Sequence, residues 1–223
     1  MTDPKKYFVP AVLGASFLAR AAYALHAGGA LIYPDESVYH GLALKMSAAA
    51  DWGGLFHSRE PLYPLLVWLT YKVTGPLPLA VKLLQAALST ASVYLLYRTA
   101  SEAFGRGAGR AALLAAAFYP FSVFYDARLL RESLLSFLGI AGLYFALKPS
   151  GEAKNIAAAS AIAGLAATAK TIFLFYWLPF LLAGLLLRKI KPAAALAGAA
   201  AFALADTPLL RYNYHYTGQA FLS

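Results

Sequence analysis

The chain has 223 residues, of which 61% are hydrophobic and 13% are charged, and its formal net charge is +9. A soluble domain of this length would carry roughly twice that charged fraction, so the composition excludes an ordinary soluble fold. The chain has no cysteine, which excludes disulfides and thiolate metal sites. Its basic residues lie in short loops between apolar runs, a pattern typical of membrane topology, so the positive charge does not indicate a nucleic-acid partner.

Apolar runs near the length of a bilayer crossing recur along the chain and predict an all-α polytopic membrane protein. The first helix is predicted over Tyr7–Ala27, and we expect it to be retained because no convincing small-residue cleavage site follows it. Lys5 and Lys6 place its start in the cytoplasm. Residues 28–77 are predicted to form a first outer loop, with an amphipathic interfacial helix over Asp35–Ala50.

The next apolar segment, Leu62–Val73, is short enough to suit either a span or the interface. Loop charges favour the interface, because a span here would leave the later basic loops outside. The remaining helices are predicted over Pro78–Tyr97, Ala111–Tyr125, Arg128–Leu147, Ile156–Ala169, Ile172–Leu187 and Ala193–Leu210. The result is a single transmembrane module over residues 1–223 with about seven spans, the N-terminus inside and the C-terminus outside. The Ala-rich start of the last helix predicts close helix packing.

Two adjacent acids, Asp35 and Glu36, follow Pro34 at the start of the predicted interfacial helix. Carboxylates there are stabilised by the helix N-terminus, so the pair suits a capping role. It equally suits a general base that takes a proton from an attacking hydroxyl or amine. The residues alone leave both interpretations open.

Two further charged segments are predicted on the outer side. Arg59 and Glu60 precede a rigid Pro61-Leu62-Tyr63-Pro64 stretch, where a guanidinium suits either a phosphate or an interfacial anchor. Arg128, Arg131 and Glu132 are spaced by three and four residues and are expected to share a helix face. This second set suits either an ion-pair cluster or an anion site for a lipid phosphate.

Three other basic residues lie in or beside apolar runs. Lys170 separates two of these runs and suits snorkelling to the surface, and Arg211 follows the last predicted span. Arg20 lies inside the first helix and is expected to face the bundle interior and pair with an acid. The histidines are scattered along the chain and predict no metal site.

The order of these segments resembles the GT-C superfamily of membrane glycosyltransferases, most closely the branch of protein O-mannosyltransferases and aminoarabinose transferases. The similar segments are the early acidic pair, Pro61-Leu62-Tyr63-Pro64, Phe118-Tyr119-Pro120, Arg131-Glu132 and Arg211-Tyr212-Asn213-Tyr214. The resemblance covers nearly the whole chain and corresponds to the N-terminal module of longer enzymes. It departs from the family at Lys170-Thr171, where an arginine followed by proline is more usual.

The resemblance implies an enzyme of a bacterial or archaeal cell membrane that moves a sugar, with inversion, from a polyprenyl phosphate to an acceptor outside the cytoplasm. It implies Asp35 and Glu36 as the catalytic residues, with Asp35 as general base and Glu36 supporting either Asp35 or the acceptor. The donor phosphate would be held by Arg59, Arg128, Arg131, Lys170 and Arg211, with Glu60, Tyr63 and Glu132 supporting. Protein, lipid and glycan acceptors, a divalent metal and a partner subunit stay open. The alternative is a non-catalytic module that binds polyprenyl phosphate or a partner subunit.

Overall fold

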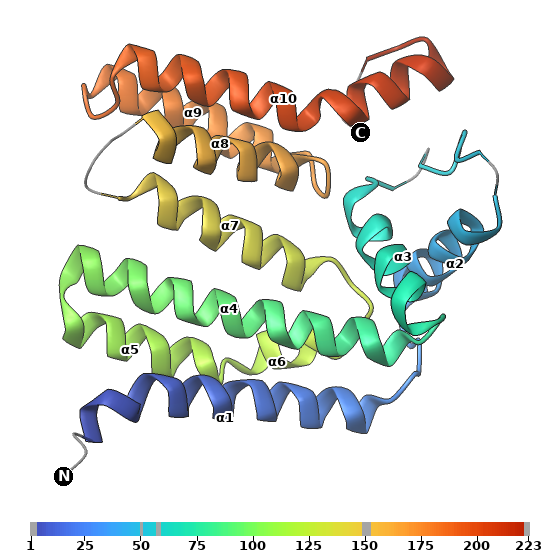
Figure 1. The fold of residues 1–223 in the computed structure, drawn as a ribbon, viewed down its shortest axis with the longest axis horizontal. Helices are drawn as coiled ribbons and strands as arrows, with labels where there is room; N and C mark the ends of the chain where they lie inside the picture. The colour runs from blue at the N-terminus through green and yellow to red at the C-terminus, as the bar shows by residue number, and fades with distance from the viewer. Residues whose placement is uncertain (1–3, 50, 57–58, 149–152, 221–223) are drawn as a thin grey trace. The chain divides into compact units, whose positions relative to one another are not determined.

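The computed structural model describes residues 4–49, 51–56, 59–148 and 153–220, and over these ranges the only regular structure is helix (Figure 1). The helices are α1 (Pro4–Ala27), α2 (Pro34–Ala48), α3 (Leu62–Thr74), α4 (Pro78–Phe104), α5 (Arg106–Ala117), α6 (Pro120–Asp126), α7 (Glu132–Ala146), α8 (Ala153–Ala167), α9 (Ile172–Leu186) and α10 (Pro192–Thr217). Proline opens several of them, including α4, α6 and α10, because its missing N–H has no partner in the first turn anyway.

Three helices are long and apolar enough to cross a membrane: α1 over Tyr7–Ala27, α4 and α10. The bent pair α5 and α6 makes a fourth candidate if it is counted as one span. The predicted class, a helical membrane protein, is therefore confirmed. The helices α7, α8 and α9 are apolar but have only 15 residues each, so the count of about seven spans stays a prediction.

The chain divides into two compact units, and unit 1 comprises Met1–Ser47 and Leu66–Phe137. In it α4 packs against α1, α5 and α6. A small apolar cluster around Val93, Leu113 and Ala117 lies between these helices. The reversal from α4 to α5 occurs at Gly105, whose φ of 88° favours glycine.

Two predicted helix boundaries in unit 1 are wrong. The helix predicted over Ala111–Tyr125 is broken, because Pro120 holds Tyr119 in an extended conformation and α6 leaves α5 at an angle of 51°. The helix predicted from Arg128 begins instead at Glu132. Arg128 therefore lies in the turn before α7, and the helix face predicted for Arg128 and Glu132 does not exist.

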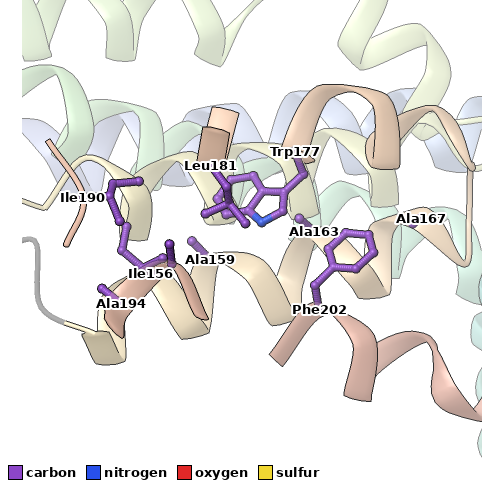
Figure 2. Packing of buried hydrophobic residues seen from close by; sticks show 10 residues of the cluster. Ile156, Ala159, Ala163, Ala167, Trp177, Leu181, Ile190, Ala194 and Phe202 are labelled. Atoms are coloured by element: carbon purple, nitrogen blue, oxygen red, sulfur yellow. The ribbon is translucent and has the colours of Figure 1, made fainter. Parts of the chain in front are cut away.

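Unit 2 comprises Ala48–Leu65 and Leu138–Ser223, and in it α8 packs against α9 and α10. Figure 2 shows its core, in which Trp177 and Phe202 pack among alanines that include Ala163. A Cβ on Gly164 would lie 2.7 Å from the carbonyl oxygen of Phe202, so only glycine fits where α8 meets α10. The close packing predicted from the Ala-rich run is confirmed.

The last helix is longer than predicted. It continues past Leu210 to Thr217 and ends at Gly218, which has the left-handed φ of 73° that favours glycine at a helix end. Arg211 consequently lies inside α10 rather than beyond it.

Candidate functional site

The early acidic pair occupies the first turn of α2, where its two members have different surroundings. Asp35 is exposed and Glu36 is fully buried. The Oε2 atom of Glu36 accepts hydrogen bonds from the backbone N–H groups of Ile32, at 2.7 Å, and Tyr33, at 2.9 Å. Glu36 is the third residue of α2, so its bond from the N–H of Tyr33 is the contact that an acid at this position makes in a capping box.

The second oxygen of Glu36 makes a long-range contact. Its Oε1 atom accepts the backbone N–H of Leu129 at 2.7 Å, across 93 positions in sequence. Asp35 precedes Glu36 and Arg128 precedes Leu129, so this bond links the segments that carry the predicted base and the predicted phosphate ligand.

The guanidinium of Arg128 is buried against aromatic rings. The side chain is 8% exposed, and its Cζ lies 4.8 Å from the ring centroid of Phe124 and 5.9 Å from that of Tyr33. Within the described residues, its Nε and Nη1 atoms have no hydrogen-bond partner. A buried cation with unused donors is strongly suited to bind an anion.

Arg131 and Glu132 follow at the start of α7, and both are half-buried. The Oε2 atom of Glu132 is buried and has no hydrogen-bond partner among the residues that the structure describes. Five predicted residues of unit 1 therefore lie within a few sequence positions of the hydrogen bond between Glu36 and Leu129: Asp35, Glu36, Arg128, Arg131 and Glu132.

Arg20 is the predicted intramembrane cation, and its partner is Asp126 at the end of α6. The Nε of Arg20 lies 2.8 Å from Oδ2 of Asp126, and both side chains are buried. The Oδ1 of Asp126 accepts hydrogen bonds from Ser89 and Ser133, each at 2.6 Å. The expected interior pairing of Arg20 is confirmed, and the network joins α1, α4, α6 and α7.

A further polar contact joins α2 to α3 in unit 1. His40 lies one turn after Glu36, and its Nδ1 is 2.7 Å from the hydroxyl of Tyr71. Burial raises the pKa of Tyr71 to about 12. Across the described ranges, no three His, Asp or Glu side chains gather as a metal site.

Unit 2 holds the other predicted residues. Tyr63 is buried at the start of α3, while Arg59 and Glu60 precede it in a half-buried stretch. The backbone N–H of Leu62 donates to the carbonyl of Thr168 at 3.2 Å. The end of the stretch that carries Arg59 and Glu60 therefore lies beside the turn that carries the exposed Lys170. Arg211 lies elsewhere in unit 2, in a groove of about 710 Å³ along α10, whose lining also includes Leu204, Thr207, Pro208, Tyr212, His215 and Tyr216.

The groove adjoins a loop attachment that the sequence did not predict. The hydroxyl of Tyr216 donates a hydrogen bond to the carboxylate of Asp51, and Tyr212 donates to the carbonyl of Trp52 at 2.6 Å. The bond from Tyr216 holds the pKa of Asp51 below its ordinary value. Asp51 and Trp52 are thereby fastened to the end of α10.

The chain matches the dolichyl-phosphate-mannose-protein mannosyltransferase family over residues 57–211, more than half of its length. It belongs to this family. Membership confirms the resemblance to the GT-C superfamily and supports a membrane glycosyltransferase. Asp35 and Glu36 precede the matched range, whereas every other predicted site residue lies within it. No curated protein and no solved structure gives a significant match.

Proposed function

We propose that the protein transfers a sugar from a polyprenyl-phosphate donor to an acceptor outside the cytoplasm, with inversion at the anomeric carbon. The family description names a dolichyl-phosphate sugar and a protein acceptor, which supports a lipid-phosphate donor and a protein as the first acceptor to test. The observation that carries the proposal is the buried guanidinium of Arg128, whose Nε and Nη1 lack partners in the described structure. Arg128 lies in the turn after α6. The next residue, Leu129, donates its backbone N–H to Glu36, the neighbour of Asp35.

In the proposed reaction Asp35 is the general base. Its carboxylate takes the proton of the acceptor hydroxyl as that oxygen attacks the anomeric carbon. The bond from the anomeric carbon to the donor phosphate oxygen breaks on the opposite face, and the lipid phosphate leaves with its electron pair. Arg128 and Arg131 stabilise the negative charge that develops on this phosphate.

Glu36 supports the reaction without exchanging a proton in this proposal. Both of its carboxylate oxygens accept backbone N–H groups, so it holds the segment of Asp35 in place. Glu132 orients the neighbouring arginine, Arg131. Arg59, Lys170 and Arg211, with Glu60 and Tyr63 in support, remain predicted contributors from unit 2, to be tested one at a time.

We also propose that α7, α8 and α9 cross the membrane, which gives about seven spans in a single module with an inward N-terminus and an outward active site. Helices of 15 residues extend only about 22 Å, so this topology requires local thinning of the bilayer. The chain has no cysteine, so single-cysteine variants at Lys45 and Arg106, on either side of α4, report the orientation of that helix. Labelling by an impermeant maleimide in intact cells at Lys45 and not at Arg106 is expected, and the reverse pattern would overturn the orientation.

The central test is Asp35→Asn, which keeps the side-chain shape but removes the base. We expect transfer from a polyprenyl-phosphate sugar to fall by about 10²- to 10⁴-fold, with donor binding unchanged. Asp51→Asn is the matched control, because Asp51 is also exposed but belongs to the attachment on α10. Full activity of Asp35→Asn would remove Asp35 from the mechanism.

The second test separates transfer from binding. Arg128→Gln is expected to weaken binding of polyprenyl phosphate, because the amide lacks the charge and the planar fork of the guanidinium. Unchanged binding would favour an ion-pair role for the arginines. A wild-type chain that binds the donor but transfers to no protein, lipid or glycan acceptor would instead favour the non-catalytic binding module.

A further inference from the structure

The helix α4 carries a stripe of buried polar residues near its start. Lys82, Gln85 and Ser89 are spaced by three and four residues and therefore share one helix face. All three are buried, and the first two are completely buried. Polar side chains buried in a helix long enough to cross a membrane are costly unless they are hydrogen-bonded, and they usually serve a function.

Lys82 binds the loop between α1 and α2. Its Nζ donates to the carbonyl oxygens of Gly28, at 2.9 Å, and Ala30, at 2.8 Å. The loop that leads into Asp35 is therefore fixed to α4 by a charged side chain.

Gln85, one turn further along α4, binds the other functional segment. Its Nε2 donates to the carbonyl oxygens of Asp126, at 3.0 Å, and Arg128, at 2.6 Å. Ser89 completes the stripe by donating to the carboxylate of Asp126 at 2.6 Å. The turn that carries Arg128 is thus fixed to the same helix face as the loop before Asp35.

We propose that this stripe on α4 sets the distance between the general base and the donor cation, with Lys82 positioning Asp35 and Gln85 positioning Arg128. Lys82 and Gln85 are positioning residues, because each binds backbone carbonyls rather than a ligand. The assignment of catalytic roles to Asp35 and Arg128 rests on the proposed function. The contacts by which Lys82 and Gln85 hold these two segments are independent of that assignment.

The two variants Lys82→Met and Gln85→Leu test the proposal, because each removes the donors of one positioning residue. Lys82→Met is expected to lower kcat about tenfold or more with donor KM within about twofold, since the loop before Asp35 loosens while Gln85 still holds the turn of Arg128. Gln85→Leu is expected to raise donor KM by about tenfold, since the turn of Arg128 loosens. Lys82→Arg keeps a cationic donor and is expected to recover most of the lost kcat.

Hydrogen exchange on the full chain provides a readout independent of turnover. Lys82→Met should speed exchange at the amides of Ile32 and Tyr33, and Gln85→Leu should speed it at Leu129. Lys72→Met is the matched control, because Lys72 is an exposed lysine of α3. If Lys82→Met or Gln85→Leu does not fold, Lys82→Gln and Gln85→Asn replace them, since these shorter amides stay polar but reach less far.

The outcomes distinguish this proposal from the proposed function. A wild-type chain without transfer activity would refute the function, while exchange and binding of polyprenyl phosphate would still decide whether the two segments are positioned separately. Equal changes of kcat and KM in both variants, or exchange unchanged at all three amides, would overturn the positioning role.

Discussion

The interiors of the two units differ in their main contacts. Unit 1 is held by charged and polar side chains, with the pair Arg20 and Asp126 at its centre. Unit 2 is held by small residues and aromatic rings, with Trp177 stacked on Phe180 at 4.8 Å. Helices in a membrane gain little from apolar burial against each other, so either hydrogen bonds or close backbone approach must hold them together. Hydrogen bonds also fix direction, and the predicted base lies in the unit whose interior holds the buried ion pair.

The largest expected effect comes from breaking the central pair of unit 1. Arg20→Met removes the cation and leaves the carboxylate of Asp126 buried without its charge partner, at a cost of about 3–5 kcal/mol. Thermal unfolding in detergent, followed by circular dichroism, would show the loss as a markedly lower Tm.

The double variant Arg20→Met with Asp126→Leu is the control for this interpretation. It removes both charges, so no uncompensated ion stays buried, and it should recover much of the lost stability. A double variant as unstable as the sum of the two single variants would show that the pair acts through packing and not through charge.

A smaller effect is expected where the two helices of unit 2 meet. Gly164→Ala places a Cβ 2.7 Å from the carbonyl oxygen of Phe202, and a backbone atom cannot move aside cheaply. Overpacking of this kind costs about 1–3 kcal/mol, which unfolding in detergent would resolve. Gly142→Ala is the matched control, because its Cβ would lie 3.7 Å from the Ala159 carbonyl, an ordinary contact. Equal Tm changes in the two variants would refute a close approach at Gly164.

The class of the protein could be predicted because apolar length and loop charge are local properties of the sequence. The need of Arg20 for an acid was also predictable, since a lone charge in a membrane is costly. Its partner Asp126 was not, because the pairing depends on how α6 returns to α1. The bend at Pro120 had a signal, since proline disfavours helix at the residue before it.

In the predicted site too, local features could be predicted from the sequence and contacts between distant segments could not. The acidic pair and the arginines could be found from charge and order along the chain, whereas their different burial could not. Glu36 differs from Asp35 because Leu129, far along the sequence, donates its N–H to Glu36. Lys82 and Gln85 gave a weak signal, polar residues inside an apolar run, which indicates interior contacts without identifying them.

The smallest expected effect lies at the polar attachment of unit 2, where Tyr216 binds Asp51. The pKa of Asp51 is lowered from 3.8, so the folded protein favours the carboxylate. This contribution is fully present above pH 3.8 and is lost only as pH falls through the lower pKa of the folded state. Attachment of the loop should therefore be constant from about pH 5 to pH 8.

Tyr216→Phe removes the hydroxyl that donates to Asp51, and the bond from Tyr212 to Trp52 remains. Hydrogen exchange over residues 51–56 should accelerate only a few-fold, by about the same factor across this pH range. Tyr214→Phe is the matched control, because Tyr214 lies on the same helix with its side chain 65% exposed. An acceleration that appears only near neutral pH would indicate that another titrating group, and not Asp51, holds the loop. The attachment of this loop would then depend on the charge of a residue other than Asp51, whereas the polar network of unit 1 depends on the charge of its own member Asp126.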